Sequence, residues 1–90
     1  MKPQPLKRML RYDERGRKSH QLSIPRSRDD LVMMTDAINY VRPIYNLRYE
    51  ISDWLKTNCS EDYRVLEGRI VVDVHFQSER DATLFWTFHA

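Results

Sequence analysis

Two polar side chains two positions apart, Asp73 and His75, are the first candidates for chemistry in this chain. Residues i and i+2 of a strand project from the same face, so a carboxylate and an imidazole would lie together there, an arrangement that a metal-dependent nuclease could use. The same pattern is typical of ordinary polar surface on a strand. The remaining histidines and the cysteine, His20, His89 and Cys59, are scattered and lack metal-ligand spacing. We therefore predict no metal site and no cofactor.

The single cysteine, Cys59, is a poor candidate nucleophile. It precedes Ser60, Glu61 and Asp62, whose negative charge would raise the pKa of the thiol and disfavour the reactive thiolate. The chain has two glycines, too few for a glycine-rich loop that cradles phosphates. These observations favour a protein that is not an enzyme.

The cysteine count and the apolar runs also bear on location. One cysteine cannot form an internal disulfide, which fits a reducing compartment. The longest apolar runs, residues 31–34 and 70–72, are much too short to cross a bilayer. We expect a cytoplasmic protein without a membrane partner.

Positive charge is concentrated at the N-terminus. Residues 1–28 hold nine basic and two acidic side chains, a net charge of +7, whereas residues 29–90 hold six basic and eleven acidic ones, a net charge of −5. Such a segment can neutralise phosphates, and an aromatic ring within it can stack on a base. A solubilising or docking tail would have the same composition. The predicted nucleic-acid-binding residues are Lys7, Arg8, Arg11, Tyr12, Arg15, Arg17 and Lys18.

Aromatic residues in the middle of the chain support a second interpretation. On the expected helices several apolar side chains fall outside the main core stripe, and small proteins seldom leave that much apolar surface exposed. The sheet and the N-terminal segment could cover them, or they could bind a host protein or a second copy of this chain, for which tyrosine is a favoured anchor. The residues of this predicted protein interface are Tyr40, Tyr45, Tyr49 and Lys56.

The elements that carry these residues follow from periodicity. Residues 1–28 read as a basic arm, and we keep two alternatives: a hairpin of residues 7–12 and 18–24 turning at Gly16, or a short helix. Ser27 is a candidate N-cap, and apolar residues recur at helical intervals to about Val41. Pro43 should break this helix and begin a second one that extends to about Thr57.

The C-terminal third changes to alternating periodicity. Tyr63 and Val65 face one way on a strand, a tight turn follows at residues 67–68, and a second strand places Ile70, Val72, Val74 and Phe76 on one side. Ser78 should cap a helix through about Leu84, after which the chain continues as a last strand or as a fraying helix end. The exposed face of this hairpin, with Asp73 and His75, has few aromatics, so we expect nucleic acid to contact the basic arm alone.

The segment VHFQSERDATLFWTF resembles the ends of small accessory proteins of tailed bacteriophages. The matching residues are Phe76, Ser78, Glu79, Asp81, Ala82 and Phe85, within about fifteen of the ninety residues. The resemblance implies a phage accessory protein that acts in the cytoplasm of an infected bacterium, and it implies no catalytic residue.

Together these observations predict an α+β fold. Two helices broken at Pro43 should pack on a small antiparallel sheet within a single domain, residues 29–90, preceded by a basic arm or hairpin, residues 1–28. The predicted function is that of a small non-enzymatic binding protein that engages nucleic acid or a nucleoprotein. The alternative is a protein-protein module that inhibits a host enzyme, and a metal-dependent nuclease is the third interpretation.

Overall fold

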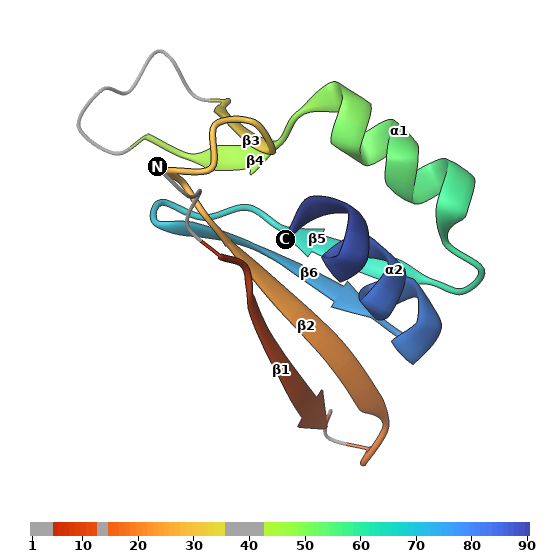
Figure 1. Cartoon of the computed structure of the whole chain (residues 1–90). Coiled ribbons are helices and arrows are strands. Elements are labelled where there is room, and N and C mark those ends of the chain that lie inside the picture. Colours follow the sequence, from red (N-terminus) through yellow and green to blue (C-terminus); the bar gives the residue numbers. More distant parts are fainter. Residues whose placement is uncertain (1–4, 13–14, 36–42) are drawn as a thin grey trace.

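The computed structural model describes residues 5–12, 15–35 and 43–90, which form a small α+β fold (Figure 1). Its elements in chain order are β1 (Lys7–Tyr12), β2 (Lys18–Pro25), β3 (Val32–Met34), β4 (Tyr45–Leu47), α1 (Tyr49–Asn58), β5 (Tyr63–Leu66), β6 (Val71–Phe76) and α2 (Glu79–His89). Within these residues no helix is long and apolar enough to cross a membrane. The predicted combination of two helices with an antiparallel sheet is confirmed, but the positions of several elements differ from the prediction.

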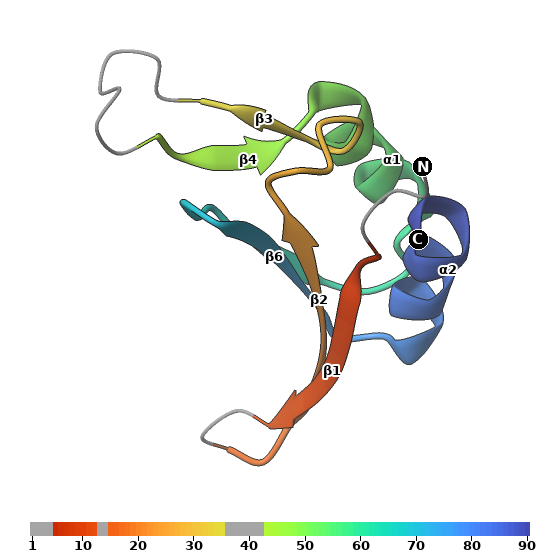
Figure 2. The same ribbon diagram turned by 60° about the vertical axis from the view of Figure 1, so that its left-hand side comes forward.

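Four strands form the main sheet in the order β1-β2-β6-β5, and every neighbouring pair is antiparallel. Strand β6 alternates strictly: Val72, Val74 and Phe76 are fully buried, whereas Val71, Asp73 and His75 are only half-buried. Both helices lie on one face of the sheet (Figure 2), and the ring of Phe76 packs against Phe85 of α2 at a centroid separation of 5.8 Å, so the buried set points to that face. The sheet therefore has one face packed into the core and one face open.

The two helices complete the core. In α1, Ile51 and Leu55 are one turn apart and both are buried, so they face the core together. In α2, Phe85 is fully buried, and its ring packs edge-on against Trp54 of α1 at a centroid separation of 5.5 Å. The contact joins the helices over the sheet.

Helix α2 begins as predicted, with Ser78 as its N-cap. The Ser78 hydroxyl accepts a hydrogen bond from the backbone N–H of Asp81. The helix continues to His89, well beyond Leu84, so the alternative of a last strand is wrong. Burial of Phe85 explains the extension, because a helical turn at this point places its ring in the core.

The N-terminal segment forms a hairpin, one of the alternatives that the sequence left open. Strands β1 and β2 pair from Lys7 opposite Ser23 to Tyr12 opposite Lys18, and Gly16 has a positive φ of 77° in their connection. A loose arm or a short helix is therefore wrong for residues 7–12. Strand β2 also pairs with β6, so the hairpin belongs to the main sheet. The boundary expected after residue 28 stays a prediction about domain organisation.

The predicted first helix is wrong over its described part. After a single turn at residues 28–32, where the N–H groups of Leu31 and Val32 donate to the carbonyl of Arg28, the chain enters β3. The predicted helix would have buried Leu31 and Met34 on one face. In the structure Leu31 and Val32 are buried and Met34 is exposed. The cause is tertiary: Val32, a β-branched residue, pairs with the buried Leu47. Residues 36–42 lie outside the described part of the chain.

The second helix begins later than predicted. Ile44 precedes β4, and Tyr45 and Leu47 lie within that strand, so α1 begins only at Tyr49. Strand β4 pairs with β3, and Tyr45 also bridges Gly68 in the turn between β5 and β6. A helix break at Pro43 is therefore not what the structure shows, because the residues after Pro43 are extended.

The hairpin of β5 and β6 is confirmed, with one exception at its turn. Tyr63 and Val65 are half-buried and alternate with the exposed Arg64 and Leu66, as the sequence indicated. Ile70, however, precedes β6 and is 70% exposed, so it does not share the core side with Val72.

Candidate nucleic-acid interface

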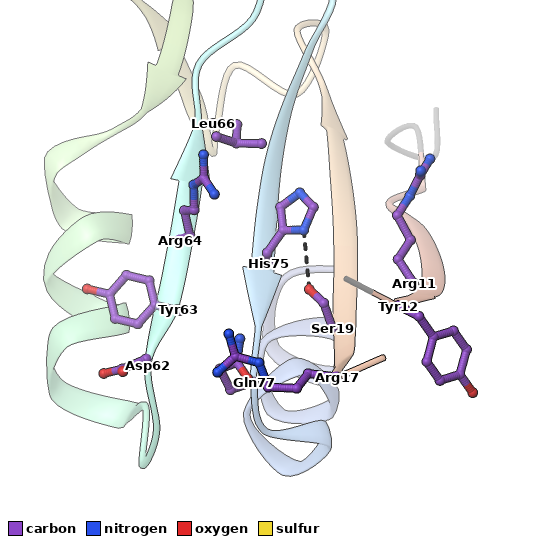
Figure 3. A pocket seen from close by; sticks show the side chains of 10 residues that line it. All are labelled: Arg11, Tyr12, Arg17, Ser19, Asp62, Tyr63, Arg64, Leu66, His75 and Gln77. Carbon is purple, nitrogen blue, oxygen red and sulfur yellow. Dashed lines mark hydrogen bonds between the residues drawn. The ribbon is translucent and has the colours of Figure 1, made fainter. Parts of the chain in front are cut away.

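A groove with a volume of about 380 Å³ lies on the open face of the main sheet, toward the end of the β1-β2 hairpin (Figure 3). All four strands or the residues beside them contribute to it. We call it the sheet groove, and it is lined by Arg11, Tyr12, Arg17, Ser19, Asp62, Tyr63, Arg64, Leu66, His75 and Gln77. Three guanidinium groups and one carboxylate are among these side chains.

Strand register brings basic residues from distant parts of the sequence to this groove. Arg11 of β1 is opposite Ser19 of β2, and His75 of β6 is opposite Arg64 of β5. Directly paired residues in antiparallel strands project from the same face. Because Asp73 and His75 project away from the core, Arg64, which pairs with His75, lies on the open face as well. Gln21 of β2 also pairs with His75 and shares this face, but its side chain is buried there.

His75 lies in the middle of the groove. Its Nδ1 is 3.3 Å from the Ser19 hydroxyl oxygen, so β2 orients the ring (Figure 3). Burial lowers the pKa of His75 below its ordinary value, and the nearby charges of Arg64 and Arg11 lower it further, while Asp73 opposes them. The two arginines repel a protonated His75 ring. An anion bound between them would attract the imidazolium and would therefore favour the protonated form.

Asp73 and His75 are held by different serines of β2. The Ser23 hydroxyl donates a 2.5 Å hydrogen bond to Oδ1 of Asp73, and Ser19 contacts His75. No group of three histidine, cysteine or carboxylate side chains is arranged as a metal site within the part of the chain that the structure describes. The nuclease interpretation and the prediction of no metal both stay predictions.

The predicted nucleic-acid-binding residues do not all gather at the groove. Arg11, Tyr12 and Arg17 line it. Arg8 instead points to the helix layer, where its Nη2 donates a 2.9 Å hydrogen bond to the Thr83 hydroxyl. The remaining three are exposed and lie outside the groove lining: Lys7, Arg15 and Lys18.

Arg28, which contributes to the positive charge of residues 1–28, has a structural position. It is 5% exposed, pairs with Asp30 at 3.0 Å and donates from Nη2 to the backbone carbonyl of His89 at 2.7 Å. A cation at the last carbonyls of a helix satisfies groups that the helix leaves unpaired and complements its dipole. Arg28 therefore links the segment after β2 to the end of α2.

The sequence prediction missed part of the groove. We expected nucleic acid to contact the N-terminal segment alone, which stays a prediction, but Tyr63, Arg64 and His75 line the same groove as Arg11 and Tyr12. The alternation of residues 63–66 indicated which side chains face out, yet nothing in the sequence indicated that β2 pairs with β6. That pairing is what brings the basic hairpin next to the β5-β6 hairpin.

The predicted protein-interface residues lie on several elements. Tyr45 is half-buried in β4 and packs against the core, so it is not on a helix. Tyr49, at the first position of α1, is 76% exposed, and Lys56 is exposed in the last turn of the same helix. Tyr40 lies outside the described residues.

Cys59 is half-buried at the C-cap of α1. Burial, with the negative charge of Asp81, raises the pKa of its thiol to about 11, against a smaller opposing effect of Arg80. The expected direction is confirmed, although the charge responsible is Asp81 and not the adjacent Glu61 and Asp62. A thiol with this pKa is protonated at neutral pH and is a weak nucleophile.

Comparison of the chain with protein-family models, with curated proteins and with solved structures finds no match. The resemblance of residues 74–88 to phage accessory proteins therefore stays a prediction.

Proposed function

We propose that this chain is a small non-enzymatic binding protein that engages nucleic acid through the basic hairpin and the sheet groove. The observation that supports the proposal is the convergence of Arg11, Arg17 and Arg64 on one concave surface of the open sheet face. Guanidinium groups are suited to phosphate because they donate several hydrogen bonds in a planar fork and keep their charge.

The distribution of charge over the fold supports the same proposal. The strongly basic segment, residues 1–28, supplies β1 and β2, and Arg64 of β5 adds a cation from the otherwise acidic remainder. Exposed cations on neighbouring strands can neutralise several phosphates at once, and releasing their counterions drives nonspecific binding. A phage origin and a cytoplasmic location would fit this function, and both are proposals.

The decisive experiment compares two triple variants of equal charge. One replaces the groove residues Arg11, Arg17 and Arg64 by alanine. The matched control replaces three exposed cations outside the groove by alanine: Arg26, Lys56 and Arg69. Binding to a labelled oligonucleotide of about 16 nucleotides is measured by fluorescence anisotropy, at salt concentrations between about 50 and 200 mM.

The groove variant should bind much more weakly and should show a slope of log affinity against log salt that is shallower by about 2, since three phosphate contacts are lost. The control should keep most of its affinity and its slope. Equal losses in the two variants would show that net charge alone governs binding and would reject the groove as the site.

One observation favours a competing function. Tyr49 leaves 76% of its surface exposed on the helix side of the molecule, and Phe88 of α2 is 66% exposed. An inhibitor or other protein-protein module could use Tyr49 as an anchor, as tyrosine often does at interfaces. Capture of partners from lysate by the wild type and by Tyr49→Ala, each with and without nuclease, distinguishes the two. A partner that survives nuclease but is lost with Tyr49→Ala favours the protein interface.

A further inference from the structure

The floor and the rim of the sheet groove differ in chemistry. His75 and Ser19 are half-buried on the central strands, whereas Arg11 and Arg64 are exposed on the two edge strands. Both arginines are close enough to act electrostatically on the imidazole. A phosphate placed over His75 would therefore meet cationic groups from both sides and a ring nitrogen from below.

An aromatic residue stands at the outer rim of the groove, on the edge strand β1. Tyr12, the last residue of β1, lines the groove at its outer edge and is 61% exposed, and its ring points outward, away from His75 (Figure 3). Its ring contributes little to the core. Exposed aromatic rings next to a basic track are what proteins use to stack unpaired bases, and the stacking tolerates any sequence because every base has a π face.

We infer that the sheet groove binds single-stranded nucleic acid, with a phosphate between Arg11 and Arg64 over His75 and, where the strand passes over the edge strand β1, a base stacked on the outward-pointing ring of Tyr12. This inference rests on the proposed function and deepens it by naming the form of nucleic acid. Four neighbouring strands are separated by three interstrand spacings, so the groove is about 14 Å wide. A flexible single strand can cross this distance while it bends into the recess.

A duplex fits the same surface less well. Its bases are stacked in the interior, so no base face is available to Tyr12, and its phosphates would reach the exposed arginines more easily than the half-buried His75. A duplex could instead receive the β1-β2 hairpin in its major groove, which admits a two-stranded ribbon. That mode would use the hairpin end and would leave Arg64 and His75 without a role.

The test measures the affinity of the full chain for three labelled probes of the same sequence, about 16 nucleotides long: single-stranded DNA, single-stranded RNA and a blunt DNA duplex. Wild type is compared with Tyr12→Ala, with Tyr12→Phe, and with Tyr49→Ala as a control for loss of an exposed tyrosine on the helix side. Far-ultraviolet circular dichroism verifies that each variant is folded.

A single strand should bind the wild type about tenfold more tightly than the duplex does. Tyr12→Ala should weaken single-strand binding about tenfold and leave duplex binding unchanged, whereas Tyr12→Phe and Tyr49→Ala should keep wild-type affinity. Tighter binding of one of the two single-stranded probes would show whether the groove prefers DNA or RNA, and either preference supports the inference.

Two results would overturn the inference while the proposed function stands: duplex affinity equal to or greater than that of the single strands, or unchanged single-strand affinity in Tyr12→Ala. Binding of none of the three probes would reject the proposed function as well.

Discussion

The hydroxyl oxygen of Ser19 lies 3.3 Å from Nδ1 of His75, across the pairing of β2 with β6. A hydroxyl can donate to a neutral imidazole and accept from a protonated one, so this contact is compatible with both charge states of the ring. His75 can therefore gain a proton without losing its orientation in the sheet groove.

Nucleic-acid binding should depend on pH through His75. Burial keeps the pKa of the free ring below its ordinary value, and Arg64 and Arg11 lower it further against the opposing effect of Asp73, so the neutral ring is favoured in the free protein. A bound phosphate favours the imidazolium and raises this pKa, so binding takes up a proton. Affinity for a single-stranded oligonucleotide should increase as the pH is lowered from about 8 to about 5 at constant ionic strength.

His75→Gln provides the control, because glutamine keeps a polar side chain but does not titrate. Its affinity should vary much less over the same range of pH than that of the wild type. If the wild type and the variant change in parallel, protonation of another group is responsible and the placement of phosphate over His75 is wrong.

Asp81 should be important for stability. It is 1% exposed, and its carboxylate accepts hydrogen bonds from the backbone N–H groups of Ser60 and Glu61, at 2.9 and 3.1 Å, and from the Ser60 hydroxyl. Asp81→Asn places an amide opposite these donors and should lower the free energy of unfolding by about 2 to 3 kcal/mol. Urea denaturation measures the loss, and Glu79→Gln in the same turn, exposed to solvent, serves as the control.

The same carboxylate should make the protein sensitive to acid. Burial alone would raise the pKa of Asp81, but the hydrogen bonds from Glu61 and Ser60 and the charge of Arg80 hold it below the ordinary value of 3.8. Its contribution to stability is therefore present above the unfolded-state pKa and is lost as the pH falls through the lowered folded-state value. Asp81→Asn should lack this part of the decline. If the stability of the wild type and of Asp81→Asn had the same pH dependence, Asp81 would not be the group responsible for the acid sensitivity.

The two glycines should differ in their tolerance of alanine. A Cβ at Gly68 would lie 2.1 Å from the backbone carbonyl oxygen of Val71, so the turn between β5 and β6 must shift, at a cost of about 1 to 3 kcal/mol. Gly16 has open space around it but a φ of +77°, so alanine there costs about 1 kcal/mol of backbone strain. Urea denaturation should rank Gly68→Ala below Gly16→Ala in stability, and the reverse order would contradict the turn geometry.

Local patterns predicted the β5-β6 hairpin and the start of α2, and offered the β1-β2 hairpin as an alternative to an arm, because the deciding interactions lie close together in the sequence. The hairpin of β1 and β2 follows from two extended runs around Gly16, and the cap at Ser78 from its spacing to Asp81. The first predicted helix failed because a long-range pairing, Val32 with Leu47, outweighs helical spacing. Propensity is a weak prior where tertiary pairing competes.

Part of the lining of the sheet groove could be read from the sequence for the same reason. Composition indicated Arg11, Tyr12 and Arg17, since they stand in a visibly basic segment. Arg64 and His75 come from an acidic part of the chain and join them only through the order β1-β2-β6-β5. Periodicity assigns a residue to a face, but it does not say which strands are neighbours.

Strand β1 is an edge strand of the main sheet and, within the described residues, pairs with β2 alone. The unpaired backbone N–H and C=O groups of an edge strand can pair with another chain, and charged side chains along the strand oppose this association. The side chains of β1 include Lys7, Arg8 and Arg11. The repulsion between these cations would then oppose pairing of the β1 strands of two copies of the chain. Replacing all three by neutral residues would favour aggregation.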